Sequence, residues 1–130
     1  MTHRILVVED NEANRELVSD WLEAEGFDVI HAANLDQANA ALKGELPSVI
    51  LLDVQLGPED GLTLATAIRR DPALCQLPII AVTAHAMVTD HERVMQAGCN
   101  ACVSKPIDFR ALRAQLDRWI GVATNLPPRE

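Results

Sequence analysis

Three short apolar runs constrain the fold of this chain more than any other feature of its sequence. Each is four residues long and rich in β-branched side chains: Ile5–Val8, Val49–Leu52 and Ile79–Val82. Continuous apolar runs of this length are typical of strands buried on both faces, as in a parallel sheet. Phe27–Ile30 and Ala101–Val103 are weaker runs of the same kind, and they suit the two edges of such a sheet.

Segments with helical periodicity separate these runs. In the first two segments, Asn11 and Asn34 are predicted to cap the helix, and Gly26 and Gly44 are predicted to end it. The apolar positions predicted to face the core are Ala13, Leu17, Val18, Trp21 and Leu22 in the first helix, and Leu35, Ala38, Ala41 and Leu42 in the second.

Three further helices are predicted in the second half of the chain. The third helix is over by Asp71-Pro72, because a residue before proline disfavours helical geometry. The fourth opens with the capping box Thr89–Glu92 and ends at Gly98, and the fifth runs from about Ile107 to Gly121. The apolar positions predicted to face the core are Leu62, Ala65 and Ile68 in the third helix, and Phe109, Leu112, Leu116, Trp119 and Ile120 in the fifth.

Five strands that alternate with five helices predict a single α/β domain of the doubly wound type. Right-handed crossovers make the flavodoxin-like strand order 2-1-3-4-5 the leading topology. We expect the domain to span residues 1–121. Residues 122–130, which contain Pro127-Pro128, are expected to form a flexible C-terminal tail.

Charge and composition narrow the classes of partner. The net charge of −8 is expected to repel nucleic acid and anionic membrane surfaces. No apolar run approaches the length of a membrane span, and the odd number of cysteines, three, favours a reducing compartment. We therefore expect a cytoplasmic protein that binds neither nucleic acid nor a membrane.

Chemically active side chains follow four of the predicted strands. Counted along the chain, Glu9 and Asp10 follow the first predicted strand and Asp53 follows the third. Thr83 follows the fourth predicted strand, and Lys105 comes shortly after the fifth. In a parallel sheet these positions meet at one edge, where ligands bind. Oxygen ligands suit Mg²⁺, while a lysine and a hydroxyl suit the oxygens of a phosphoryl group. Asp53 is able to act as a nucleophile and form an acyl phosphate. Each residue alone is more often a cap or a surface charge, so only their joint placement predicts a site.

These segments resemble the receiver domains of two-component signalling. The resemblance extends from Arg4 to about Ile120, and it is strongest to stand-alone receivers and to those attached to hybrid histidine kinases. The matching motifs are Val7–Asn11, Leu51–Leu56, Ala81–Ala84 with the following His85–Met87, Ala97–Cys99, and Ser104–Ile107.

The resemblance implies that Asp53 is the phosphoacceptor and that Mg²⁺ is the cofactor. The phosphodonor would be a phosphohistidine on a histidine kinase or on a histidine phosphotransfer protein. Asp10 and Asp53 would bind Mg²⁺ directly, together with the backbone carbonyl of Gln55, and Glu9 would act through a water molecule.

The resemblance also implies roles for residues around the phosphoryl group. Thr83 would donate its hydroxyl to the group, and Lys105 would pair first with Asp53 and then with the acyl phosphate. Ala84 and a cis Lys105-Pro106 bond would support this arrangement.

The lifetime of the phosphoryl group raises a separate question. Gln55 and His85 each lie two residues beyond a key position and match the residues that flank the attacking water. An interpretation as ordinary surface polar residues is equally open for both.

Two departures from the family pattern are visible. Gly57-Pro58 replaces the usual proline directly after the residue occupied here by Leu56, which predicts a different path for this loop. Cys102 occupies the position of the family's switch aromatic, three residues before the lysine. The usual relay by rotation of an aromatic ring is therefore in doubt, and backbone motion of the Thr83–Met87 segment is an alternative.

A pair of cysteines and a pair of histidines are not expected to have a catalytic or metal-binding function. Cys99–Cys102 is a C-x-x-C pattern that leaves a helix and enters a strand, the reverse of a redox pair, so packing of small side chains is the default. His85 and His91 are six residues apart and would not share a helix face, so they do not predict a metal site.

The leading hypothesis is a phosphorylation-controlled binding module that acts on a downstream protein in trans, because no output domain is recognised in the sequence. It is not expected to be an enzyme in the conventional sense, beyond catalysing its own phosphotransfer and autodephosphorylation. One alternative is a small Mg²⁺-dependent phosphatase, although those usually carry an acid where Gln55 stands. Another is a degenerate receiver that binds partners without phosphorylation.

Overall fold

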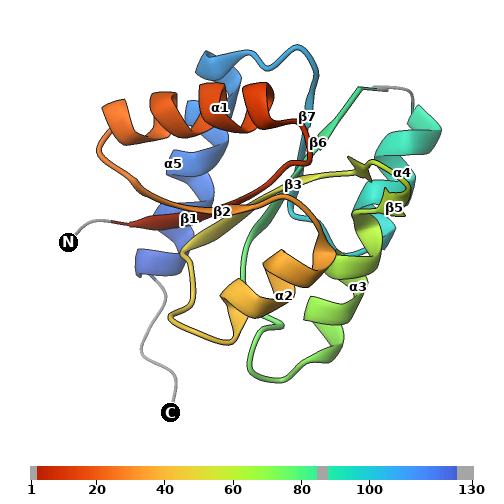
Figure 1. Ribbon diagram of the computed structural model, residues 1–130. Coiled ribbons are helices and arrows are strands. Elements are labelled where there is room, and N and C mark those ends of the chain that lie inside the picture. The colour runs from red at the N-terminus through yellow and green to blue at the C-terminus, as the bar shows by residue number, and fades with distance from the viewer. Residues whose placement is uncertain (1–2, 85–87, 126–130) are drawn as a thin grey trace.

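The computed structural model describes residues 3–84 and 88–125 of the chain (Figure 1). Over these residues it contains a five-stranded sheet, a two-stranded hairpin and five helices. The elements in chain order are β1 (Arg4–Val8), α1 (Glu12–Ala24), β2 (Asp28–Ala32), α2 (Leu35–Leu42), β3 (Val49–Asp53), β4 (Gln55–Leu56), β5 (Glu59–Asp60), α3 (Leu62–Arg70), β6 (Ile79–Thr83), α4 (Val88–Gln96), β7 (Ala101–Ser104) and α5 (Phe109–Asn125).

The large sheet has the order β2-β1-β3-β6-β7, and every neighbouring pair of strands in it is parallel. Numbered within this sheet alone, the order is 2-1-3-4-5, so the predicted flavodoxin-like topology is confirmed. The three apolar runs form its centre, where nearly every side chain is buried. The edge strand β2 covers Asp28–Ala32 rather than the predicted Phe27–Ile30, because its pairing with β1 begins at Asp28.

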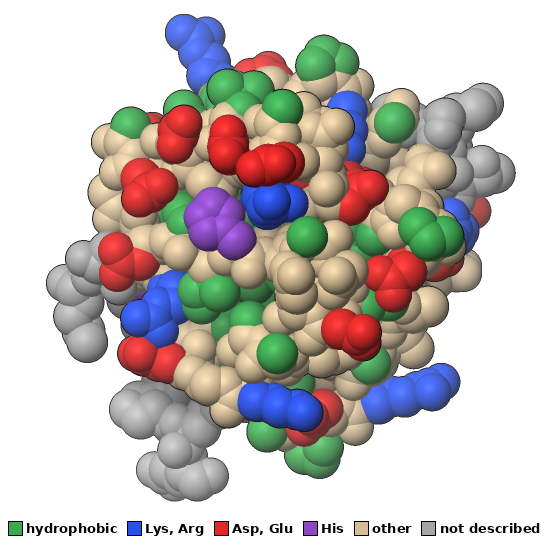
Figure 2. All heavy atoms as spheres, viewed as in Figure 1, with side chains coloured by type: hydrophobic (Ala, Val, Ile, Leu, Met, Phe, Trp, Pro, Cys, Tyr) green, Lys and Arg blue, Asp and Glu red, His purple; other side chains and the backbone are tan. Residues whose placement is uncertain are grey.

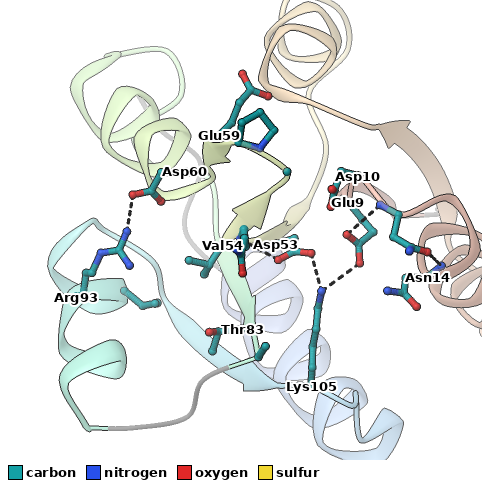
Figure 3. Close-up of a pocket in the computed structure, with 16 residues that line it drawn as sticks. Glu9, Asp10, Asn14, Asp53, Val54, Glu59, Asp60, Thr83, Arg93 and Lys105 are labelled. Atoms are coloured by element: carbon teal, nitrogen blue, oxygen red, sulfur yellow. Dashed lines mark hydrogen bonds and ion pairs between the residues drawn. The ribbon is translucent and has the colours of Figure 1, made fainter.

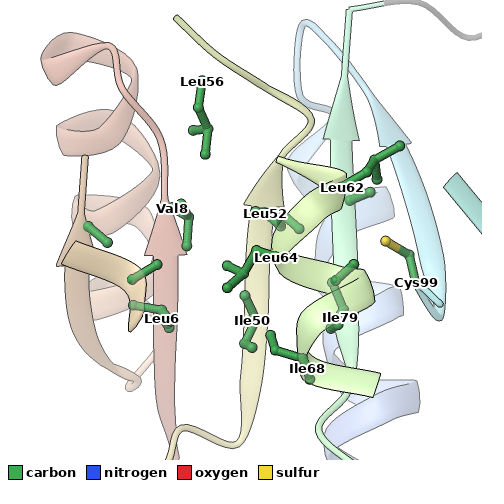
Figure 4. Packing of buried hydrophobic residues seen from close by; sticks show 14 of the residues in the cluster. Leu6, Val8, Ile50, Leu52, Leu56, Leu62, Leu64, Ile68, Ile79 and Cys99 are labelled. Carbon is green, nitrogen blue, oxygen red and sulfur yellow. The ribbon is translucent and has the colours of Figure 1, made fainter. Parts of the chain in front are cut away.

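Helices cover both faces of the sheet, with α1 and α5 on one face and α2, α3 and α4 on the other (Figure 1). Each face has its own apolar cluster. On the α2/α3/α4 face, Ile50 and Leu52 of β3 pack with Leu64 and Ile68 of α3 (Figure 4). The two clusters hold the central strands in a fixed layer, which positions the residues at the strand ends.

The aromatic residues are confined to one face of the sheet. All four in the sequence, Trp21, Phe27, Phe109 and Trp119, are half-buried against the cluster on the α1/α5 face. The rings of Trp21 and Phe109 are in contact, with their centroids 4.9 Å apart and their planes tilted by 38°. The cluster on the α2/α3/α4 face consists of aliphatic and small side chains instead.

The starts of the first two helices are as predicted. Asn11 Oδ1 accepts a hydrogen bond from Asn14 N–H at 3.0 Å, and Asn34 Oδ1 accepts one from Gln37 N–H at 2.8 Å. These contacts satisfy N–H groups that have no partner inside the helix. The predicted inward faces of α2, α3 and α5 also lie against the core.

The predicted inward face of α1 is partly wrong. Val18 and Leu22 are buried as expected, but Ala13 is exposed and the Leu17 side chain is 59% exposed. Ser19 is buried instead. The row that faces the core runs through positions 18 and 22, and Leu17 lies about 100° away from Val18 around the helix axis.

Two helix ends also differ from prediction. α4 already includes Val88, so Thr89 lies in its first turn and is not its N-cap. α5 begins at Phe109 and continues past Gly121 to Asn125. A glycine inside a helix costs only about 1 kcal/mol relative to alanine, which the packed face of α5 offsets. Residues 126–130 lie outside the described residues, so the flexible tail stays a prediction.

The segment after β3 folds into a small antiparallel hairpin that the sequence did not predict as strands. Gln55 pairs with Asp60 and Leu56 with Glu59 across the two residues Gly57-Pro58. Gly57 has a φ of 58°, which glycine adopts at little cost. The expected difference in loop path is thus a hairpin, β4–β5.

Acidic side chains outnumber basic ones on the molecular surface. In Figure 2 they gather over the region of α1, while Lys and Arg are scattered. Among the described helices, none has the length and hydropathy required to cross a bilayer.

Candidate functional site

The predicted site residues meet at the carboxyl edge of the sheet (Figure 3). Glu9 and Asp10 follow β1, Asp53 ends β3, Thr83 ends β6 and Lys105 follows β7. All five line one cleft of about 660 Å³. The parallel order of the strands therefore brings together the five groups that the sequence analysis singled out.

Three carboxylates form the acidic side of this cleft. Glu9 and Asp53 are buried, Asp10 is exposed, and one oxygen from each lies within 4.8 Å of the others. An all-oxygen donor set with one solvent-facing side suits a hard divalent cation that keeps part of its water shell. The residues present therefore fit Mg²⁺.

Lys105 balances part of this negative charge. Its Nζ lies 2.7 Å from Asp53 Oδ2 and 3.3 Å from Glu9 Oε1. Desolvation lowers the pKa of Lys105, but the hydrogen bond and charge of Asp53, together with those of Glu9, outweigh it and raise the pKa. The ammonium is held in its charged form at the centre of the cleft.

The Glu9 carboxyl has a raised pKa in this cleft. Burial raises its pKa most, the neighbouring Asp53 raises it further, and Lys105 and the N–H of Asn11 only partly oppose this, so the pKa rises to about 7. The cleft without a cation thus favours a proton on Glu9. A bound cation would favour the ionised carboxylate instead.

The phosphoryl-binding side of the cleft comes from β6 and β7. Thr83 is buried, and its carbonyl accepts a hydrogen bond from the Lys105 N–H at 2.8 Å. Ala84 is exposed and lines the cleft. The predicted cis bond between Lys105 and Pro106 is confirmed. His85 lies outside the described residues, so its part in the lifetime of the phosphoryl group stays a prediction.

Gln55 connects the phosphoacceptor position to the hairpin. Its N–H donates a hydrogen bond to Asp53 Oδ1 at 3.0 Å, so each carboxylate oxygen of Asp53 has its own donor. The Gln55 side chain is exposed and lines the cleft. Its role as a carbonyl ligand and in phosphoryl lifetime stays a prediction.

Three residues around the cleft, outside the group that surrounds Asp53, were not predicted from sequence. Asp60 of β5 and Arg93 of α4 form an ion pair at the cleft wall, and both line the cleft. Gly61 lies so close to Asp53 that a Cβ on it would be 2.1 Å from the Asp53 carbonyl oxygen. The glycine at position 61 was a visible signal of a turn or of a close approach between backbone segments. No sequence pattern links positions 60 and 93.

The two cysteines of the C-x-x-C pattern pack in the apolar cluster on the α2/α3/α4 face. No disulfide joins Cys75, Cys99 or Cys102. Cys99 is buried, and burial raises the pKa of its thiol to about 12, so it is a poor nucleophile. Cys102 is half-buried against the cluster on the α2/α3/α4 face, in agreement with the packing interpretation. His91 is exposed on α4.

Residues 5–117 match the family model described as the response regulator receiver domain. The chain belongs to this family. The receiver domain is 37% identical to the polar-differentiation response regulator DivK of Brucella ovis over 123 residues. The aligned region covers 95% of this chain and 100% of that protein. It is thus a phosphoacceptor signalling domain of two-component systems.

Solved structures agree with this placement. The receiver domain is similar to that of a sensor histidine kinase from Pseudomonas aeruginosa, with a TM-score of 0.84 and 35% identity over 93% of this chain and 99% of that one. That structure holds a magnesium ion coordinated in the active-site cleft. A response regulator from Chloroflexus aurantiacus gives a TM-score of 0.88 and 27% identity over 93% of this chain and 99% of that one.

Proposed function

We propose that Asp53 accepts the phosphoryl group, with Mg²⁺ bound, and that this changes the protein-binding surface of the domain. The observation that carries the proposal is the set of contacts to the Asp53 carboxylate. Lys105 holds Oδ2 at 2.7 Å and Gln55 N–H holds Oδ1 at 3.0 Å, and the carboxylates of Glu9 and Asp10 lie beside Asp53. A buried carboxylate with this orientation is ready for attack on phosphorus.

The donor is a phosphohistidine on a histidine kinase or a histidine phosphotransfer protein. A carboxylate oxygen of Asp53 attacks the phosphorus atom and forms a P–O bond. The P–N bond of the phosphohistidine breaks, and the imidazole leaves with the bonding electron pair. Lys105 and Thr83, which line the same cleft, then bind oxygens of the phosphoryl group.

Asp10 and Asp53 hold the cation directly in this proposal, with the Gln55 carbonyl as a third ligand and Glu9 acting through water. When bound, Mg²⁺ supplies the positive charge that offsets the phosphoryl oxygens during transfer. Glu9 contributes by giving up the proton that its raised pKa favours in the cation-free cleft.

The phosphorylated domain acts on a protein target in trans. The net charge of −8 disfavours nucleic acid and anionic membranes as alternatives. The chain is not an enzyme in the conventional sense, because its catalysis is confined to its own phosphotransfer and autodephosphorylation.

Intact-protein mass spectrometry after incubation with acetyl phosphate and Mg²⁺ tests the proposal. We expect the wild-type protein to gain one phosphoryl group, the Asp53→Asn variant to gain none, and Asp36→Asn, an exposed change on α2, to match the wild type. Equal labelling of Asp53→Asn, or an unlabelled wild type, would overturn it. Steady turnover of an external phosphate ester would support the phosphatase alternative instead.

A further inference from the structure

The β4–β5 hairpin leaves the phosphoacceptor strand and returns to touch it. Gly61 N–H donates a hydrogen bond to the Val54 carbonyl at 2.7 Å. A Cβ on Gly61 would be only 2.1 Å from the Asp53 carbonyl oxygen, so the two backbone segments are in direct contact. A displacement at Asp53 therefore reaches the end of the hairpin without passing through a side chain.

The returning strand of the hairpin, β5, contacts three helices. Glu59 Oε1 accepts a hydrogen bond from Leu35 N–H at the start of α2, at 3.3 Å. Asp60 Oδ1 accepts one from Leu62 N–H at the start of α3, at 3.0 Å. Asp60 Oδ2 forms the ion pair with Arg93 of α4 (Figure 3). The hairpin thus reaches α4 through a single charged contact that the structure describes.

The described side chains of α4 contribute little to the core. Among its residues 91–96, whose side chains are described, Val94 is buried and Met95 is 39% exposed. An element with few buried apolar contacts moves at low energetic cost. On this face Cys102 replaces the family's switch aromatic, and the four aromatic residues of the chain lie on the opposite face. Rotation of an aromatic ring beside α4 is therefore excluded.

We propose that the Arg93–Asp60 ion pair couples the phosphorylation of Asp53 to the position of α4. The inference rests on the proposed function and concerns how phosphorylation at this site changes the position of α4. A phosphoryl group on Asp53 adds negative charge to the cleft, which attracts Arg93 and repels Asp60. Among the residues that line the cleft, Arg93 is the second cation after Lys105. The geometry of the pair then changes, and α4 moves with Arg93.

The exposure of the pair makes this proposal testable without unfolding the protein. The side chains of Arg93 and Asp60 are 55% and 44% exposed, so the pair adds little to the stability of the fold. Asp60→Asn keeps an oxygen that can accept the Leu62 N–H, while it removes the charge. Arg93→Gln removes the partner charge, and Arg93→Lys retains it.

The experiment compares backbone amide spectra in the presence of Mg²⁺ throughout, with and without beryllofluoride, an analogue of the phosphoryl group. The proteins are the wild type, Asp60→Asn, Arg93→Gln, Arg93→Lys and the double variant. Arg113→Gln is the matched control, because it breaks exposed ion pairs of α5, to Asp117 at 3.0 Å and to Glu25 at 3.5 Å, on the face of the sheet opposite α4. Phosphorylation by acetyl phosphate is followed in parallel by mass.

We expect all variants to be phosphorylated and to show shifts at residues 53–55. In Asp60→Asn and Arg93→Gln the shifts at residues 91–96 should be at least two-fold smaller than in wild type and Arg113→Gln. The shifts at residues 91–96 in the double variant should be no smaller than in either single variant. Those in Arg93→Lys should lie between the shifts of Arg93→Gln and of the wild type. Wild-type shifts of α4 in both single variants would overturn the coupling. A wild-type protein that gains no phosphoryl group would instead refute the proposed function, and the inference with it.

Discussion

The raised pKa of Glu9 predicts that Glu9→Gln stabilises the cation-free protein at neutral pH. The carboxyl is buried beside Asp53, and its pKa rises from 4.5 to about 7 on folding. The folded state therefore holds the Glu9 proton more tightly than the unfolded chain does. Between pH 4.5 and 7 this group lowers the free energy of unfolding as pH rises, because folding then requires proton uptake.

The size of the effect follows from the shift itself. A change of one pKa unit corresponds to 1.36 kcal/mol, so this shift corresponds to about 3 kcal/mol between pH 4 and pH 8. Glutamine resembles the protonated carboxyl in shape and charge. The free energy of unfolding of Glu9→Gln should thus match that of the wild type near pH 4 and exceed it by up to about 3 kcal/mol at pH 8.

Urea denaturation followed by tryptophan fluorescence in EDTA, from pH 4 to 8, measures this difference. Glu16→Gln, an exposed change on α1, is the control and should differ from the wild type by less than about 0.5 kcal/mol throughout. Adding Mg²⁺ at pH 8 should stabilise the wild type more than Glu9→Gln, because the cation favours the ionised carboxylate. A difference between wild type and Glu9→Gln that is independent of pH would refute the reasoning.

Three further substitutions or treatments test other parts of the structure. Gly61→Ala should destabilise the protein by about 2 kcal/mol or more in urea denaturation and slow phosphorylation by acetyl phosphate, because its Cβ would overlap the Asp53 carbonyl oxygen. Arg69→Met should lower the free energy of unfolding by about 3 kcal/mol and leave phosphorylation intact, since Arg69 donates hydrogen bonds to three backbone carbonyls and to Asn100 away from the cleft. Cys99, whose thiol pKa is about 12, should resist iodoacetamide at pH 8 until the protein is unfolded, as read by peptide mass spectrometry; rapid labelling of the folded protein would contradict its burial.

The sheet and the charged centre of the site were predictable from sequence for the same reason. A central parallel strand buries both faces, so Val49–Leu52 is recognisable as an apolar run, and the residue that ends it, Asp53, is placed at the ligand-binding edge. The same logic placed Thr83 and Lys105. The alternation of apolar runs with helices, together with right-handed crossovers, favours one order of strands in the sheet.

The parts that could not be predicted depend on contacts between distant segments. The Arg93–Asp60 pair joins residues from α4 and β5, and neither residue has a local pattern that identifies its partner. The hairpin strands β4 and β5 are two residues each, too short for a periodicity to show. The exposure of Leu17 and the burial of Ser19 depend on how α1 is rotated on the sheet, which hydrophobicity alone does not define.

The distribution of side chains on the two faces of the sheet bears on how a signal leaves the cleft. On the α1/α5 face, large aromatic rings pack the helices firmly. On the other face, Val94 is the buried side chain among residues 91–96 of α4, and the small side chains of Cys99 and Cys102 belong to the same apolar cluster. An exposed ion pair contributes up to about 1 kcal/mol, which is too little to displace a firmly packed helix but enough to shift a weakly anchored one several-fold in population. With Cys102 in place of the switch aromatic and one buried side chain on residues 91–96, a charged contact such as Arg93–Asp60 is able to control the position of α4.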